Sequence, residues 1–175
     1  MIPDLPVEFT PQDAVQKNQF IFNYEEKGKA SYGILPRGDK DAKRIKWFDV
    51  DTHSVFHFVN SWDSTNDLGH EIVTCVAVVH STINIGLLTE HFDSPDMPNQ
   101  IITKFEFNLT TGETSRKPLH SFKCEFPVIN QEFVGRQNRY VYLAAIQETD
   151  AAAPQICKDN GFYNSVLKFD ILDEK

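Results

Sequence analysis

Apolar and polar residues alternate over short runs along this chain of 175 residues, and turn residues separate the runs. Alternation with a period of two indicates β-strands, because successive side chains of a strand point to opposite faces of a sheet. The pattern predicts strands over residues 19–23, 30–35, 44–50, 54–62, 70–79, 102–109, 139–145 and 164–172. A helical spacing occurs only over residues 83–89, where Gly86 weakens it. The sequence therefore predicts an all-β fold.

Three segments share one plan, in which an apolar strand leads to Asn or Asp and then to a charged turn. They are residues 20–35, 104–119 and 166–175, with Asn23, Asn108 and Asp170 at equivalent positions. In the first two segments an outgoing strand follows the turn, which predicts a hairpin. Hairpins repeated at such distances favour propeller blades with long loops. Because the spacing is uneven, a β-sandwich remains an equal alternative.

Composition shows that the chain can bury a core, since 41% of its residues are hydrophobic and 14 are Phe. The net charge of -8 argues against nucleic acid or an anionic membrane as a partner. No run approaches the roughly 20 apolar residues of a membrane span. Cys75, Cys124 and Cys157 are far apart and lack Cys-x-x-Cys spacing, which predicts reduced thiols rather than disulfides or a zinc site. Together with a start that lacks a secretory signal, this predicts an intracellular protein of the cytoplasm or a plastid.

Residues 48–62 raise a chemical question, because this apolar run carries His57 near its centre. In a regular strand Phe56 and Phe58 share one face, and His57 shares the other with two valines. Both faces are apolar, so we expect a strand that is buried on both sides. A buried imidazole needs a hydrogen-bond partner or a metal ion.

A second unusual stretch, residues 115–144, places Glu125 beside Cys124 and between two phenylalanines. Buried carboxylates are rare unless they are paired. In one interpretation Glu125 accepts the second ring proton of a metal-bound histidine. In the other it caps a loop or pairs with Arg136. The residues alone do not bring His57 and Glu125 together.

Six motifs give these stretches a wider context. They are YGILPR (32–37), IKWFDV (45–50), VFHFVNSW (55–62), FEFNLTTGE (105–113), EFPVIN (125–130) and FVGRQNRYVYLA (133–144). In this order the chain resembles the carotenoid cleavage oxygenases, which include epoxycarotenoid dioxygenases, stilbene dioxygenases and the retinal pigment epithelium isomerase. The resemblance covers nearly the whole chain. It implies that residues 1–175 are an internal fragment, about three blades from the middle third of a seven-bladed β-propeller.

The resemblance also implies a metal site. In the family, four histidines bind Fe(II) on the propeller axis and three glutamates orient histidines from behind. His57 lies in the family pattern F-H-x-x-N-(A/S)-W and Glu125 in E-F-P-x-I-N, so His57 is the implied iron ligand and Glu125 its implied support. The remaining ligands would lie outside this chain. His53 is expected near the rim, and His70, His80, His91 and His120 are expected to be exposed without a ligand role.

The implied function is that of an oxidoreductase, a non-haem Fe(II) dioxygenase that cleaves a conjugated C=C bond of a carotenoid or apocarotenoid with O2 to give carbonyl products. No catalytic acid or base is expected, because the iron carries the chemistry. Phe56 is a candidate for lining an apolar substrate tunnel. We expect the fragment alone to be inactive and any membrane contact to come from regions outside it. Open alternatives are an iron-dependent isomerase, a stilbene-cleaving dioxygenase and a non-catalytic propeller module.

Overall fold

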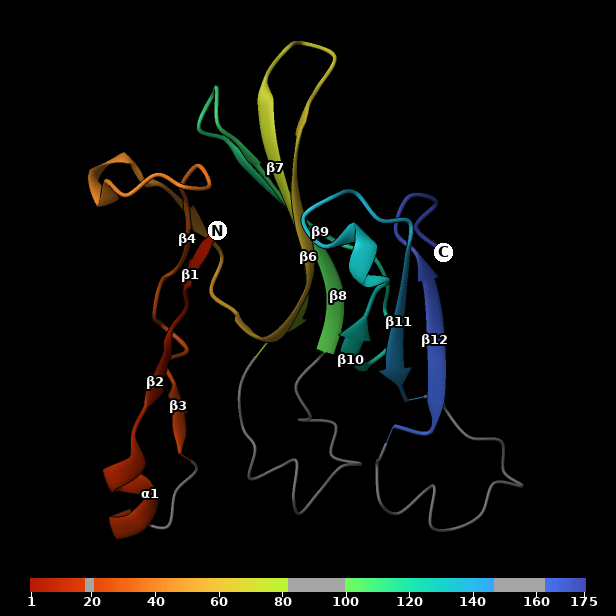
Figure 1. Ribbon diagram of the computed structural model, residues 1–175. Helices are drawn as coiled ribbons and strands as arrows, with labels where there is room; N and C mark the ends of the chain where they lie inside the picture. Colours follow the sequence, from red (N-terminus) through yellow and green to blue (C-terminus); the bar gives the residue numbers. More distant parts are fainter. Residues whose placement is uncertain (18–20, 82–99, 147–162) are drawn as a thin grey trace.

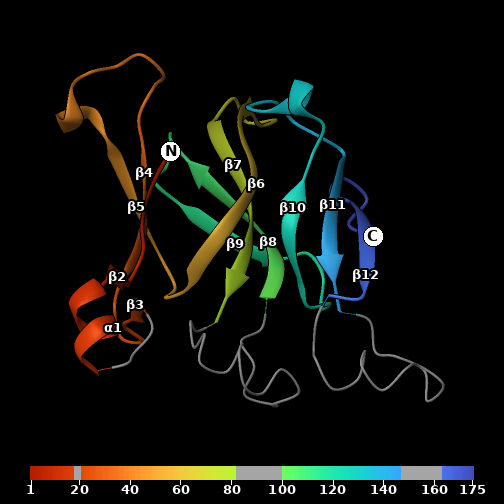
Figure 2. The same ribbon diagram turned by 60° about the horizontal axis from the view of Figure 1, so that its bottom comes forward.

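Three antiparallel sheets follow one another along the chain and lie side by side (Figures 1 and 2). The structure is a computed structural model, and it describes residues 1–17, 21–81, 100–146 and 163–175. We call the sheets first, central and third in chain order. A two-stranded ribbon, β2-β3, and the short helix α1 extend from the first sheet (Figure 1).

The elements of each sheet are as follows. The first sheet has the order β1-β4-β5, with β1 (Ile2–Asp4), β4 (Ala30–Ile34) and β5 (Lys46–Val50). The central sheet has the order β6-β7-β8-β9, with β6 (Ser54–Thr65), β7 (Glu71–His80), β8 (Gln100–Asn108) and β9 (Thr114–Pro118). The third sheet has the order β10-β11-β12, with β10 (Cys124–Val128), β11 (Tyr140–Ala145) and β12 (Ser165–Asp170). The ribbon joins β2 (Val7–Phe9) to β3 (Phe22–Tyr24), with α1 (Pro11–Lys17) between them, and two 3-10 turns cover Ala42–Arg44 and Gln131–Phe133.

The central sheet is covered on both faces by apolar cores. On one face, Cys75, Ala77 and Val79 of β7 pack with aromatic residues of the first sheet and of β8. On the other face, Val76 and Val78 of β7 pack with residues of the third sheet. Strand β7 is therefore the strand that is buried on both sides, which its nearly continuous apolar run explains. Because both faces carry a core, the sheets stack as neighbouring blades do and do not form a two-sheet sandwich.

Strand β6 departs from regular pairing with β7 in the stretch that carries His57. Its partners change from Val79 opposite Val55 to Ala77 opposite Phe58, so that one extra residue is accommodated on β6. A second extra residue lies between Phe58 and Asn60. Such bulges bend a strand and redirect its side chains. They explain why Phe56, His57 and Phe58 are exposed, whereas strict alternation predicted burial on both sides.

The hairpin β8-β9 shows how the sequence encodes a turn. The Asn108 side chain accepts hydrogen bonds from the backbone N–H groups of Thr110 and Thr111, each at 3.0 Å. Gly112 follows at φ +84°, in the left-handed region that glycine adopts without steric cost. The turn residues thus set the register that places Phe105 opposite Arg116.

The all-β prediction is confirmed, and the strands predicted over 30–35, 44–50, 54–62, 70–79, 102–109, 139–145 and 164–172 correspond to β4, β5, β6, β7, β8, β11 and β12. The strand predicted over 19–23 is confirmed at Phe22 and Asn23, in β3, and residues 19 and 20 lie outside the described residues. The predicted hairpin over 20–35 is wrong, because β3 pairs with β2, and β4 pairs with β1 and β5. The hairpin predicted over 104–119 is confirmed as β8-β9. The predicted helix over residues 83–89 lies outside the described residues.

Candidate metal centre

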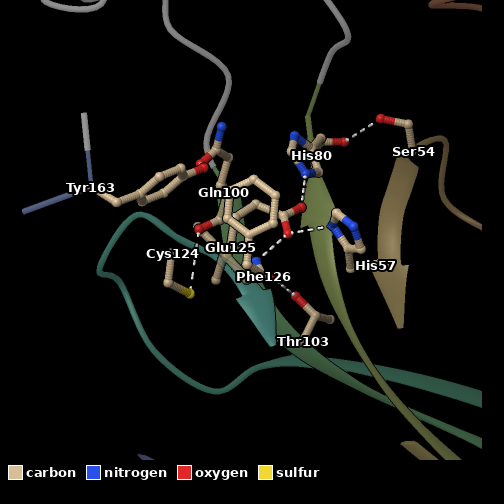
Figure 3. A network of polar contacts seen from close by, with 10 residues as sticks. Ser54, His57, His80, Gln100, Thr103, Cys124, Glu125, Phe126 and Tyr163 are labelled. Atoms are coloured by element: carbon tan, nitrogen blue, oxygen red, sulfur yellow. Dashed lines mark hydrogen bonds and ion pairs between the residues drawn. The ribbon is translucent and has the colours of Figure 1, made fainter. Parts of the chain in front are cut away.

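His57 and Glu125, the two residues singled out by motif, are in contact. Nδ1 of His57 lies 2.8 Å from Oε2 of Glu125, although the two residues are 68 positions apart in sequence. They come from different sheets, with His57 on β6 and Glu125 on β10 (Figure 3). Since a carboxylate accepts, Nδ1 of His57 donates this hydrogen bond. A neutral imidazole that donates through Nδ1 keeps the lone pair of Nε2 available for a metal ion.

The surroundings of the two groups differ sharply. The His57 side chain is 47% exposed, whereas the Glu125 side chain is 5% exposed. Our expectation of a buried imidazole at position 57 is therefore wrong, because the bulges of β6 turn this part of the strand outward. The carboxylate is the buried partner, and it holds an accessible imidazole from behind. This is the geometry by which a carboxylate orients a metal-binding histidine.

Glu125 accepts two further hydrogen bonds. Its Oε1 lies 2.6 Å from Nε2 of His80, and its Oε2 also accepts from the backbone N–H of Phe126 at 2.7 Å. Phe126 has a φ of +53°, which is unusual for a residue with a side chain, and the pairing of β10 with β11 is irregular just after Glu125. The local turn therefore aims a backbone donor at the same oxygen that meets His57.

The alternative reading of Glu125 is partly right and partly wrong. The carboxylate caps its own turn through Phe126, as that reading predicted. Among the described residues, however, its side-chain partners are the imidazoles of His57 and His80 and not the guanidinium of Arg136. The buried carboxylate is paired, as buried acids generally are.

His80 was predicted to be exposed, and this prediction is wrong. Its side chain is only 3% exposed, and it lies at the end of β7 between Ser54 of β6 and Gln100 of β8. The polar residues that follow it in sequence suggested a surface turn. A stronger signal was available, because His80 ends an apolar run that is buried on both faces.

His53 was placed near the rim and is instead fully buried between the first and central sheets. Its Nδ1 donates to the backbone oxygen of Asp51 at 2.7 Å, and its Nε2 accepts from the Tyr32 hydroxyl at 2.9 Å. Burial lowers the pKa of His53 and raises the pKa of Tyr32. Both ring nitrogens of His53 are occupied, so it is a core residue rather than a ligand. His70 and His120 are partly exposed, and His91 lies outside the described residues.

Aromatic rings surround the contact between His57 and Glu125. The ring centroids of Phe126 and His57 are 5.3 Å apart. Those of Phe56 and His80 are 4.9 Å apart, and these two rings are nearly perpendicular. Phe56 is 37% exposed and Phe126 is 55% exposed. The Tyr163 ring packs edge-on against Phe126, and its hydroxyl donates to Oε1 of Gln100 at 2.6 Å. Burial, followed by the negative charge of Glu125, raises the pKa of Tyr163.

Asn60 ties strand β6 to the loop that follows β10. Its Nδ2 donates to the backbone oxygens of Phe133 and Arg136 at 2.9 and 2.8 Å, and also lies 2.8 Å from Oδ1 of Asn138. Its Oδ1 accepts from the backbone N–H of Gly135 at 3.0 Å. Three residues after His57, this side chain connects the strand that carries the imidazole to the sheet that carries Glu125.

Among the described residues, the chemistry of His57 fits that of a metal ligand. His57 offers an imidazole nitrogen of the type that suits Fe(II), with a carboxylate behind it, so it fits one corner of an iron site. Within the described ranges no group of three or more His, Cys, Asp or Glu side chains could hold a metal ion. A complete site would need ligands from other segments.

The cysteines, a surface recess and the lack of a long apolar helix complete the description of the described residues. Cys75 and Cys124 are free, as predicted, and burial raises their thiol pKa values to about 12 and about 11. Cys157 lies outside the described residues. A polar recess of about 510 Å³ lies at the end of the central sheet opposite His80, and it includes none of the residues of the His57–Glu125 cluster. It is lined by Ser64, Asn66, Ile72, Glu106, Asn108, Glu113, Thr114 and Ser115. In the part of the chain that the structure describes, no helix is long and apolar enough to cross a membrane.

The described residues thus form a blade-like arrangement of sheets with an accessible histidine held by a buried carboxylate. Comparison with known proteins then identifies the family. The family model described as "Retinal pigment epithelial membrane protein" matches residues 1–175, and the chain belongs to this family, the carotenoid cleavage oxygenases. The predicted family membership is confirmed.

Individual relatives agree with this assignment. A carotenoid 9,10(9',10')-cleavage dioxygenase 1 of Pisum sativum is 31% identical over 170 residues, which are 96% of this chain and 28% of the relative. A chloroplastic 9-cis-epoxycarotenoid dioxygenase of Oryza sativa subsp. japonica is 30% identical over 142 residues, which are 81% of this chain and 21% of the relative. The chain thus spans about a quarter of the length of the curated relatives it matches.

Solved structures show the same fold. A cobalt-substituted apocarotenoid oxygenase of Synechocystis matches with a TM-score of 0.73 and 18% identity, over 99% of this chain and 34% of that chain. A lignostilbene dioxygenase of Pseudomonas brassicacearum matches with the same TM-score and identity, over 99% of this chain and 36% of that chain. The fold prediction is confirmed, since the chain is all-β and forms part of a propeller.

Proposed function

We propose that this chain is an internal part, about three blades, of a non-haem Fe(II) dioxygenase that cleaves a conjugated C=C bond of a carotenoid or apocarotenoid with O2. The observation that carries the proposal is the hydrogen bond between Nδ1 of His57 and the buried carboxylate of Glu125. Family membership and the printed activities of the relatives support the substrate class.

In this proposal His57 is one of the iron ligands, and Glu125 fixes its orientation. The buried carboxylate holds the Nδ1 proton, so Nε2 is directed to the metal with its lone pair free. Bound Fe(II) would activate O2 for addition across the conjugated double bond, giving two carbonyl products. No side chain of this chain is assigned the role of acid or base.

Phe56 and Phe126 serve as apolar walls beside the metal centre. Each ring is partly exposed and lies against a histidine of the cluster, Phe56 against His80 and Phe126 against His57. A conjugated polyene gains binding free energy from such aromatic surfaces and offers no polar group to recognise. These rings therefore position the substrate and exclude water, and O2 is the second substrate.

The test compares single variants in the full-length protein of which we propose this chain to be part. We expect His57→Ala to lose both bound iron and cleavage, because it removes a metal bond. Glu125→Gln offers only one acceptor oxygen to three donors, and we expect about 10- to 100-fold weaker iron binding. His70→Ala is the matched control, because His70 precedes β7 at the end opposite His80.

Iron stoichiometry, thermal melting and product analysis under ¹⁸O2 provide the readouts. The proposal expects ¹⁸O in the carbonyl products of the wild type and an unchanged iron content in His70→Ala. Full iron content in a folded His57→Ala variant would refute the metal assignment. Iron binding with geometric isomers as products and no label would instead support an isomerase. Cleavage of stilbenes but not of carotenoids would correct the substrate class.

A further inference from the structure

Two imidazoles share one buried carboxylate in this cluster (Figure 3). His57 meets Oε2 of Glu125 and His80 meets Oε1, so each oxygen has its own imidazole. The two histidines differ in accessibility, because the His57 side chain is 47% exposed and the His80 side chain is 3% exposed. Of the two, His57 is the one placed to reach a ligand, and the ring hydrogen bond of His80 goes to Glu125.

His80 is held more firmly than His57. It lies on β7, which is paired on both sides, with Ser54 on one neighbour and Gln100 on the other. Its backbone oxygen accepts from Oγ of Ser54, and its ring stands at 85° to the Phe56 ring. The backbone and the ring are both constrained, so Nε2 of His80 is a donor with a set position.

We propose that His80 is a positioning residue, which holds the carboxylate of Glu125 in the rotation that presents Oε2 to His57. The proposal rests on the proposed function, in which His57 binds the metal. A carboxylate can turn about its last side-chain bond, and one donor on each oxygen removes that freedom. Without His80, Oε1 would be a buried acceptor that lacks its partner, a state that proteins avoid by rearrangement.

The arrangement also defines what His80 does not do. Its Nε2 carries the proton that Oε1 of Glu125 accepts, so this nitrogen is not free to bind a metal ion. The proposal thus requires one tautomer at each histidine, with the proton on Nε2 of His80 and on Nδ1 of His57. Both tautomers can be observed directly.

Two substitutions separate positioning from simple packing. His80→Leu fills space but has no donor, whereas His80→Gln carries an N–H donor at about the reach of Nε2. In the full-length protein, titration with Co(II) should show about 10-fold weaker affinity for His80→Leu, at the lower end of the usual effect of such partners. His80→Gln should bind Co(II) with nearly wild-type affinity. His57→Ala should not bind it at this site.

A second readout does not need a metal. Long-range ¹H–¹⁵N spectra of the metal-free protein report which ring nitrogen of each histidine carries the proton. We expect Nε2-H at His80 and Nδ1-H at His57 in the wild type. In His80→Leu the signal of His57 should become a mixture of the two tautomers, and His80→Gln should restore Nδ1-H.

The outcomes distinguish this proposal from the proposed function. If the wild type binds no Co(II), the proposed function fails, and the tautomer of His57 in the two variants still decides the positioning role. If His57→Ala abolishes binding but His80→Leu and His80→Gln both match the wild type, positioning is overturned. If both variants bind Co(II) equally weakly and melt at equally lowered temperatures, His80 has a structural role, and the positioning role is again overturned. If His80→Leu does not fold, the wild type and His80→Gln decide the question. A proton on Nδ1 of His80 in the wild type would refute the proposal. A proton on Nε2 of His80 in the wild type, together with nearly wild-type Co(II) affinity in His80→Gln, would support it.

Discussion

Replacement of Asn60 by Ala tests whether one side chain joins the strand that carries His57 to the sheet that carries Glu125. Asn60 is 8% exposed and contacts four groups of the loop after β10: the backbone oxygens of Phe133 and Arg136, the backbone N–H of Gly135, and Asn138. It also accepts from the backbone N–H of Ser61. We expect the Ala variant to unfold at a lower temperature and the loop to exchange its amide hydrogens faster.

The magnitude follows from the number of hydrogens available. Nδ2 has two hydrogens for three acceptors, so about four full hydrogen bonds are made by the amide in total. At about 1 kcal/mol net for each bond the loss is about 4 kcal/mol. Most residues of the loop are exposed, so water can replace some of these hydrogen bonds in the variant. We therefore expect the free energy of unfolding to decrease by about 2 to 3 kcal/mol. For a chain of this length that corresponds to a melting temperature lower by about 4 to 12 °C.

The assay is thermal unfolding of the chain followed by far-ultraviolet circular dichroism, with hydrogen exchange at Gly135. The matched control is Asn66→Ala, since Asn66 also accepts two backbone N–H groups, from Leu68 and His70, but lies in an exposed turn. We expect the control to lose about 1 kcal/mol or less. A melting temperature of Asn60→Ala equal to that of the control would refute the reasoning.

Three further outcomes follow from the structure. Burial lowers the pKa of His53 below its ordinary value of 6.5, so the folded state binds this proton less well than the unfolded state. The contribution of His53 to stability should be constant well above pH 6.5 and should decrease as the pH falls below it. In denaturant titrations the free energy of unfolding should therefore fall more steeply below pH 6.5 in the wild type than in His53→Gln. The thiols of Cys75 and Cys124, whose pKa values are raised by burial, should react with a thiol reagent only after unfolding; with Cys157 replaced by Ser, fast reaction in native buffer would contradict their burial. The 175-residue chain alone, in whose described part His57 is the one candidate ligand, should not retain stoichiometric Fe(II) on metal analysis and should not cleave a carotenoid.

Much of the strand content could be predicted from alternation alone. Strands such as β4 and β11 carry strict alternation or continuous apolar runs between clear turn residues, so local pattern and tertiary structure agree. Strand β10 was not predicted, because its sequence CEFPV is short and contains Glu and Pro, two residues that are depleted in strands. Pro127 is tolerated there since β10 pairs with β11 alone within the third sheet. The short helix α1 has no buried residue and therefore left no apolar periodicity to detect.

The candidate metal centre could be predicted only in part for a related reason. The contact between His57 and Glu125 was suggested by motif, since nothing in the spacing of two residues 68 positions apart brings them together. His80 was missed because its exposure depends on the third sheet, which covers the end of β7 through β10. The bulges of β6 were missed because a two-residue departure from pairing leaves no trace in a pattern of apolar residues on both faces.

Those bulges also govern which changes of length the protein can tolerate. One extra residue on β6 exchanges the two faces of the strand, and a second one restores them, so Trp62 stays on the side of the third sheet. Deletion of a single residue between Val55 and Asn60 would rotate Trp62 and Asn60 to the opposite face. Deletion of two would keep both in place and erase only the outward excursion that contains His57. The strand should therefore tolerate insertion or deletion of two residues better than of one. A protein that has lost two residues here should still fold, but it would lack the outward turn that presents His57.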